Sequence, residues 1–315
     1  MKKNLSPILS GLIVSNLLGV FCVTLCRYLV NKKPEIGENL GLLIYSNFII
    51  VPILMGVITA YYLRKTNLKN YQYFLVAIAN TLVAVALSAL FIGEGYLCLL
   101  IVSPLIIAFV TVGMFIGKKM FGKKDNRLNI SFAAVLLFLF LVDGFSEHHF
   151  ENCVSDTILI KAPPEKVWNY VVAYEPNPVN NEFWLFRIGM PSPVQSTVDG
   201  YKVGAGRKCI FSNGYTFDEK MTVYKPNQDL MFDIVRQPRD PEIMGHIDIL
   251  KGQFLLHDNH DGTTTLTGNS WYRLHVFPAW YYDLWASTIV RQVHIRVMHY
   301  IKALSERGPS GNQPR

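Results

Sequence analysis

A glutamate on an apolar strand face is the residue of this sequence best placed to do chemistry. In the segment TFDEKMTVY (216–224), the alternation of a β-strand puts Glu219 on the same face as Phe217 and Met221. A carboxylate on a face that packs into a core needs a partner, or its pKa rises. The candidate partner is Arg207, on the preceding strand segment. Three roles remain open for Glu219: an internal ion pair, an acid that orients a ligand, and a general acid or base.

Other titratable side chains gather toward the C-terminus. Tyr272 belongs to the more apolar face of the strand segment 263–276, where a phenol could either pack in the core or donate a hydrogen bond to a ligand. His294 and His299 lie in a helical segment and titrate near neutral pH. They do not share a helix face as an i, i+4 metal pair would, and His294 falls outside the apolar stripe of its helix. We therefore interpret both histidines as surface or partner-bonded side chains.

The sequence predicts no metal site and no cofactor. Glu147, His148, His149 and Glu151 are of metal-ligating types, but they lie in a segment that we interpret as a solvated linker. The five cysteines contain no C-x-x-C pair, and no G-x-S-x-G, H-E-x-x-H or phosphate-loop motif occurs. The motifs therefore point to none of the common hydrolase, metalloprotease or nucleotide-binding classes.

Composition and charge indicate a membrane protein and exclude nucleic acid as a partner. Half of the residues are hydrophobic and 17% are charged, which is rich in apolar residues for a soluble protein. The formal charge is +6 over residues 1–155 and +1 over residues 156–315. Because a nucleic-acid-binding domain should itself be basic, the charge is better explained by membrane orientation.

Four apolar stretches are long enough to cross about 30 Å of hydrocarbon: residues 7–30, 40–63, 72–92 and 96–117. A fifth stretch, 130–142, is shorter, and we interpret it as a further crossing.

The topology depends on that fifth stretch. Basic residues follow the second and fourth stretches, which predicts that these loops are cytoplasmic. Five crossings place the C-terminal half outside the cytoplasm, and four leave it in the cytoplasm. The multi-span design without eukaryotic targeting signals favours a bacterial plasma membrane.

The C-terminal half reads as an α+β domain. A strand (156–162) and a helix (163–172) are followed by a proline-rich loop region and then by a series of strand segments and a long final helix, at 206–211, 216–224, 229–235, 251–258, 263–276 and 278–306. Such a sheet must bury one face against the final helix. We thus expect a transmembrane helical domain, a juxtamembrane linker, the α+β domain and a disordered tail, at 1–145, 146–155, 156–307 and 308–315.

The segments ILIKAPPEKVWNYV, GQFLL, TTTLTGNSWYRL and HIRVMHYIKALSE together resemble the SRPBCC superfamily, also called START-like or polyketide cyclase/dehydrase and lipid transport proteins. The resemblance covers about residues 154–307 and none of the membrane half. It implies a helix-grip fold, in which a curved antiparallel sheet wraps a long C-terminal helix and encloses a hydrophobic pocket. The superfamily has no universal catalytic residue, so the resemblance supplies a fold and no mechanism.

On this basis we expect a membrane-anchored protein that binds or transfers a lipid or another hydrophobic small molecule. Strand and helix faces predict the pocket lining: Arg207, Cys209, Phe211, Phe217, Glu219, Met221, Phe232, Ile234, Tyr272, Val293 and Val297. Two alternatives remain. One is a cyclase- or hydrolase-type enzyme, which needs Glu219 to converge with a histidine or with Tyr272. The other is a structural or sensory module whose pocket is filled by side chains; of the three, we favour binding over catalysis.

Overall fold

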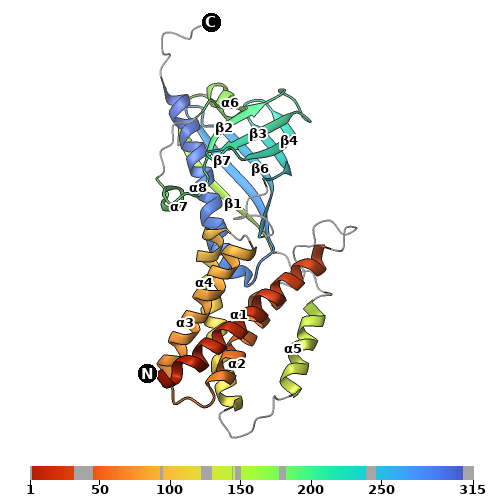
Figure 1. Ribbon diagram of the computed structural model, residues 1–315. Helices are drawn as coiled ribbons and strands as arrows, with labels where there is room; N and C mark the ends of the chain where they lie inside the picture. The colour runs from red at the N-terminus through yellow and green to blue at the C-terminus, as the bar shows by residue number, and fades with distance from the viewer. Residues whose placement is uncertain are drawn as a thin grey trace. The chain divides into compact units, whose positions relative to one another are not determined.

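The computed structural model of the protein describes residues 2–31, 45–92, 95–121, 130–143, 145, 150–176, 182–238 and 246–307. The chain divides into two compact units. The first consists mainly of residues 1–149, and the second contains the residues from Phe150 onward except for two short segments, Asp240–His246 and His275–Phe277, which belong to the first. Figure 1 shows that the first unit is helical and that the second contains the sheet.

The first unit contains α1 (Lys2–Asn31), a π-helical turn (Ser46–Ile50) that continues into α2 (Val51–Leu63), α3 (Asn70–Leu87) with a π-helical turn at its end (Ser88–Ile92), α4 (Tyr96–Phe121) and α5 (Ile130–Asp143). Among the described residues, four helical segments are long and apolar enough to cross a membrane, and they coincide with the four predicted stretches. Residues 40–44 of the second stretch lie outside the described residues. α5 has 14 residues and is not one of the four.

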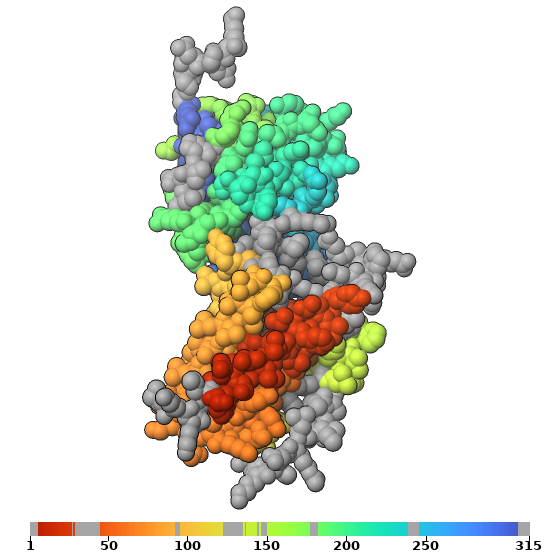
Figure 2. All heavy atoms as spheres, in the orientation of Figure 1, coloured from red at the N-terminus to blue at the C-terminus, as the bar shows by residue number. Residues whose placement is uncertain are grey.

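Glycines allow the helices of the first unit to pack closely. A Cβ on Gly56 of α2 would lie 2.1 Å from the carbonyl oxygen of Val110 in α4, and one on Gly113 of α4 would lie 2.1 Å from the carbonyl oxygen of Ile53. Only glycine therefore fits where these two backbones meet, as is common between membrane helices. In contrast, α1 lies at the surface of the unit (Figure 2), and its Leu17 is 65% exposed.

A buried amide connects three helices of the same unit. Asn80 of α3 accepts hydrogen bonds from Ser15 Oγ (3.2 Å) and from the Asn16 amide of α1, and its own amide donates to Thr59 Oγ1 of α2 (3.0 Å). All four residues are at most 2% exposed. Polar bonds between apolar helices fix the rotation of each helix because the alternative is an unpaired polar group in an apolar medium.

The second unit is a seven-stranded antiparallel sheet in the order β1-β7-β6-β5-β4-β3-β2. Its strands, in chain order, are β1 (Phe150–Ile160), β2 (Pro193–Val198), β3 (Gly206–Phe211), β4 (Thr216–Lys225), β5 (Asp229–Arg236), β6 (Ile247–Asp258) and β7 (Thr264–Leu274). The helices are α6 (Pro164–Val172), α7 (Trp184–Arg187) and α8 (Ala279–Glu306). α8 packs against β1, β7 and β2 (Figure 1), so the two edges of the sheet are brought around one helix, which is the predicted helix-grip arrangement.

The structure differs from the sequence prediction at four places in this unit, one of which is the start of β6 at Ile247, four residues before the predicted start. β1 begins at Phe150, six residues before the predicted start, so residues 150–155 belong to the sheet and not to a linker. β2 and α7 lie in the region predicted as a proline-rich loop. β2 can begin with Pro193 because it is an edge strand, where a missing backbone N–H is tolerated. The predicted disordered tail, 308–315, lies outside the described residues.

Candidate functional site

A buried ion pair lies at the centre of the candidate site. Arg207 of β3 and Glu219 of β4 are directly opposed in the antiparallel ladder, and their side chains form a hydrogen-bonded ion pair. Arg207 is 3% and Glu219 5% exposed, and Arg207 Nε also donates to the Val172 carbonyl oxygen (3.1 Å). Burial raises the pKa of the Glu219 carboxyl, although the Arg207 guanidinium opposes that shift. The predicted partner of Glu219 is therefore confirmed.

A second polar side chain beside this pair has no nitrogen or oxygen hydrogen-bond partner. Tyr174 follows α6 and is held by a two-way backbone bridge to Ser196 of β2, with N···O distances of 3.1 and 3.2 Å. Its side chain is 5% exposed, and its hydroxyl has no nitrogen or oxygen hydrogen-bond partner, although the sulfur of Cys209, a weak acceptor, is close enough to interact with it. Burial raises the pKa of this phenol well above its usual value, and the charges that act on it include Arg207 and Glu219. Tyr174 was not predicted, because it lies outside any periodic segment.

The inner face of the sheet is closed at one end and accessible at the other. Near α6, Met221 and Phe232 join a continuous buried core with α8 residues such as Val297. Phe217, at the other end of β4 from Met221, and Phe211, on the adjacent β3, are only partly buried. Solvent therefore reaches an apolar part of the inner face, and the buried pair lies where the closed and accessible parts meet.

The predicted pocket residues differ in how far they are buried, and one of the partly buried residues, Ile234, packs against the core near α6. The buried ones are Arg207, Glu219, Met221, Phe232, Tyr272 and Val297. The partly buried ones are Cys209, Phe211, Phe217, Ile234 and Val293. Burial raises the pKa of the Cys209 thiol to about 12, so at neutral pH this side chain behaves as a neutral, largely apolar group.

Tyr272 does not offer its hydroxyl to a ligand. The side chain is fully buried on the inner face, as its strand alternation predicts, and its hydroxyl donates to Asp283 Oδ1 of α8 (2.5 Å). Asn152 of β1 donates to the same carboxylate at 3.0 and 3.1 Å. Glu219 is thus paired with Arg207 and converges neither with Tyr272 nor with a histidine, so the predicted acid–base pairing is not present.

A second polar cluster on the inner face was not predicted. Asp156 of β1, Ser270 of β7 and His294 of α8 form a chain in which Ser270 Oγ lies 2.6 Å from His294 Nε2 and Asp156 Oδ2 lies 3.3 Å from His294 Nδ1. Arg291 Nε lies 2.9 Å from the second oxygen of Asp156. Burial lowers the pKa of His294, while Asp156 opposes that shift.

The prediction that His294 lies outside the buried stripe of its helix was wrong. The side chain is 6% exposed because His294 is one turn from both Val290 and Met298, which are themselves buried. The sequence signal that could have shown this burial is the spacing of four residues between His294 and each of Val290 and Met298. His294 was instead assigned to the polar face of the helix, because histidine is polar and lies next to the apolar residues of the stripe.

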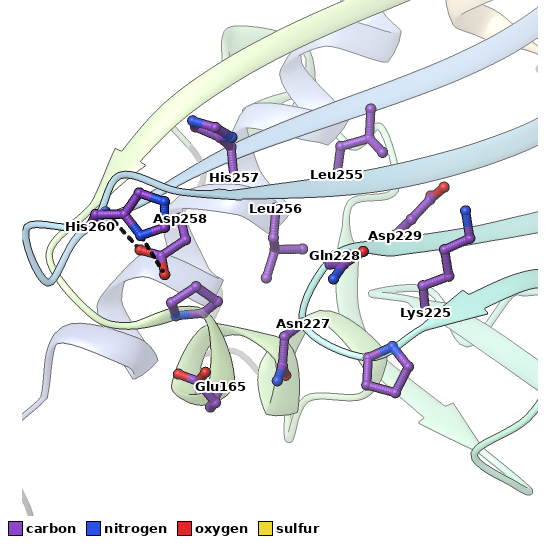
Figure 3. A pocket seen from close by; sticks show the side chains of 12 residues that line it. Glu165, Lys225, Asn227, Gln228, Asp229, Leu255, Leu256, His257, Asp258 and His260 are labelled. Atoms are coloured by element: carbon purple, nitrogen blue, oxygen red, sulfur yellow. Dashed lines mark hydrogen bonds and ion pairs between the residues drawn. The ribbon is translucent and has the colours of Figure 1, made fainter.

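A surface depression of about 640 Å³ lies beside the turns that end β4 and β6 (Figure 3). Glu165 of α6, Asn227 of the β4–β5 turn, and Asp258 and His260 near the β6–β7 turn line it. Most of its lining is polar or charged, and it contains none of the predicted pocket residues. It is therefore not the apolar pocket that the sequence predicts.

Within the described ranges, no three His, Cys, Asp or Glu side chains gather in a way that could hold a metal ion. His148 and His149 lie outside those ranges. Glu151 is paired with Arg273, with Oε1 2.6 Å from Nη2 and 2.9 Å from Nε. None of the five cysteines, all of which lie in the described ranges, forms a disulfide bond.

Comparisons with known proteins find structural likenesses only. No family model and no curated protein matches the chain. Among solved structures, the chain is similar to norcoclaurine synthase from Thalictrum flavum in complex with dopamine and hydroxybenzaldehyde, at 8% identity and a TM-score of 0.35 over 51% of this chain and 90% of that one.

Two further solved structures are similar to about the same share of this chain. The Zhui aromatase/cyclase from Streptomyces sp. R1128 shares 10% identity at a TM-score of 0.36 over 52% of this chain and all of that one. An uncharacterized protein from Bacillus thuringiensis shares 12% identity at a TM-score of 0.32 over 48% of this chain and 97% of that one. Each likeness is confined to about half of the chain and says nothing about its activity.

Proposed function

We propose that the protein is a membrane-anchored binding protein, whose second unit holds a lipid or another hydrophobic small molecule against the inner face of the sheet. The apolar helices of the first unit supply the anchor, and the helix-grip unit, which resembles the SRPBCC superfamily in sequence, supplies the site. A tethered site meets membrane-derived molecules at a high effective concentration, which favours such ligands.

The buried hydroxyl of Tyr174, which has no nitrogen or oxygen hydrogen-bond partner, is the observation that carries this proposal. A buried polar group without a partner costs about 1–3 kcal/mol, so native structures seldom leave one unless something else satisfies it. Here the hydroxyl lies near the Arg207–Glu219 pair and near Cys209, which shares its strand face with Phe211. A mostly apolar molecule with one polar group would bury its apolar part against Phe211 and Phe217 and accept a hydrogen bond from Tyr174.

The ion pair fits an orienting role better than a catalytic one. Arg207 and Glu219 satisfy each other, and Arg207 is further fixed by the Val172 carbonyl oxygen. Such a pair gives a fixed local dipole on an apolar wall, so it can select the orientation of a polar headgroup without transferring a proton to it.

The test measures binding of a fluorescent fatty-acid analogue to the full chain in detergent, and its displacement by extracted membrane lipids. We expect saturable binding that weakens by about five- to tenfold in Tyr174→Phe, which corresponds to one hydrogen bond of about 1–1.5 kcal/mol. Tyr300→Phe is the matched control, because Tyr300 packs on Tyr174 with ring centroids 5.6 Å apart and its exposed hydroxyl donates to the Pro176 carbonyl oxygen. Binding that is unsaturable, or equal in the two variants, would contradict the proposal.

A further inference from the structure

The cluster of Asp156, His294 and Ser270 has the order of contacts that a nucleophilic serine needs. A carboxylate lies next to one imidazole nitrogen, and the other imidazole nitrogen lies 2.6 Å from a serine hydroxyl oxygen. Such a constellation is recognised by geometry and roles, independently of fold and of the order along the chain. The three residues come from β1, α8 and β7, which are regular elements in mutual contact.

The protonation pattern follows from the partners. Asp156 has only acceptor oxygens when ionised, so the neutral imidazole places its proton on Nδ1 and leaves Nε2 as the acceptor for the Ser270 hydroxyl. Burial lowers the pKa of His294, which keeps the ring neutral at neutral pH and able to take a proton. Arg291 is the other charged group that contacts the cluster, through the second oxygen of Asp156.

The cluster lies on the same inner face as the proposed ligand site. In the sheet register, Ser270 of β7 is opposite Gly252 of β6, and Gly252 is opposite Phe232 of β5. Gly252 has no side chain, and the Phe232 ring occupies its place, since a Cβ there would lie 2.6 Å from that ring. The Arg207 guanidinium also lies over the Phe232 ring, 4.7 Å from the ring centroid. One aromatic ring therefore separates the two polar clusters, and Ser270 itself is only partly buried.

We propose that Ser270 is the nucleophile of an esterase activity toward esters of hydrophobic acyl groups, with His294 as its base and Asp156 as a positioning residue. This inference rests on the proposed function, because the substrate must bind against the same inner face. The apolar surroundings of Phe232 and the accessible Phe211 and Phe217 select a hydrophobic acyl chain.

The reaction balances with water as the only co-reactant. Ser270 Oγ attacks the ester carbonyl carbon as its proton passes to His294 Nε2, and the bond to the alkoxy oxygen breaks as that oxygen takes the proton from His294. Water then adds to the acyl-serine, gives a proton to His294 and releases the carboxylic acid, and the proton returns to Ser270 Oγ. Asp156 holds the ring and stabilises its charged form throughout.

The first experiment treats the full chain in detergent with a fluorophosphonate probe and locates the adduct by peptide mass spectrometry. It also follows hydrolysis of p-nitrophenyl esters of increasing acyl length. We expect one adduct, on Ser270, and faster hydrolysis of the longer esters. Peptide mapping on the unaltered chain needs no variant, so the result does not depend on whether a substitution folds.

Variants then separate catalysis from structure. Ser270→Ala should lower hydrolysis by roughly 100-fold or more and leave binding of a non-hydrolysable ether analogue unchanged. Asp156→Asn should lower kcat with little change in KM, which a purely structural role would not do. The matched control is Ser287→Ala, because Ser287 Oγ donates to the Asp283 carbonyl oxygen within α8 (2.6 Å).

Two results would overturn the inference, and they differ in what they imply. A chain that binds the ether analogue but forms no adduct at Ser270 shows that the cluster only ties α8 to the sheet, and the binding function stands. A chain that does not bind the ether analogue would contradict both the proposed binding function and the proposed esterase activity.

Discussion

Arg207 and Glu219 lie opposite each other on adjacent strands and form an ion pair that is almost completely removed from solvent. Ion pairs of this kind add little net stability, but breaking one leaves an uncompensated charge in the core. The pair lies at the boundary between the packed and accessible parts of the inner face. The stability of the pair should therefore depend on what occupies that face.

Replacing Arg207 alone should lower the free energy of unfolding much more than replacing Arg207 and Glu219 together. We expect Arg207→Met to lower the free energy of unfolding by about 3–5 kcal/mol, because Glu219 then remains buried without a partner. The double variant Arg207→Met, Glu219→Gln should recover most of that loss. Chemical denaturation of the detergent-solubilised chain measures both, and equal losses in the single and double variants would refute this reading of the pair.

The Arg207→Met variant should also respond to pH in a specific direction. The folded-state pKa of Glu219 is raised by burial, and without Arg207 the opposing effect is lost. A carboxyl whose pKa is higher in the folded than in the unfolded state contributes stability below the unfolded pKa, about 4.5, and loses it as pH rises through the folded pKa. The deficit of the variant relative to the wild type should therefore be smaller at pH 5 than at pH 8.

His294 should make the protein less stable in mild acid. Its pKa is lowered by burial, so between the folded and unfolded pKa values the unfolded chain binds a proton that the folded chain does not. Stability from the neutral ring is present above the unfolded pKa, about 6.5, and is lost as pH falls toward the folded value. The fall in Tm below that pH should be smaller in His294→Gln, and thermal unfolding at pH 5–8 checks it. An identical pH dependence in both proteins would show that other groups cause the fall.

The close approach of α2 and α4 predicts a strong effect of one methyl group. A Cβ on Gly56 would lie 2.1 Å from a backbone oxygen of α4, which cannot move aside without shifting the helix. We expect Gly56→Ala to destabilise the helical unit by about 1–3 kcal/mol. In Gly11→Ala the nearest atoms are 3.3 Å away, so the loss should be small. The measurement is the fraction of monodisperse protein left after heating in detergent, and equal losses would show that the two helices do not meet so closely.

The regular elements could be predicted because, within each of them, the apolar side chains recur at a single helical or strand spacing. The apolar stripe of α8 and the alternation in β4, β5 and β7 are continuous, and turn residues such as Asn227 and Gly262 adopt the positive φ angles that their types favour. The first half of β1 was missed because its inward side chains include Asn152. This residue is polar in sequence and becomes part of the inner face only through its partner on α8, Asp283.

The candidate site was predictable only where its residues are close in sequence. Arg207 and Glu219 are on neighbouring strands, so alternation alone brings them to one face. Asp156 and His294 lie 138 positions apart, and no sequence period relates a strand at one end of the domain to a helix at the other. Tyr174 was missed for a different reason, because a single backbone bridge, and no repeating pattern, fixes its position.

Native mass spectrometry of the full chain, released from mild detergent, tests the central claim most directly. If the inner face holds a ligand that Tyr174 recognises, the wild type and Tyr300→Phe should each carry one hydrophobic small molecule per chain, and Tyr174→Phe should lose most of it. If all three proteins show the mass of the chain alone, or the same variable number of attached lipids, the second unit is not a binding domain.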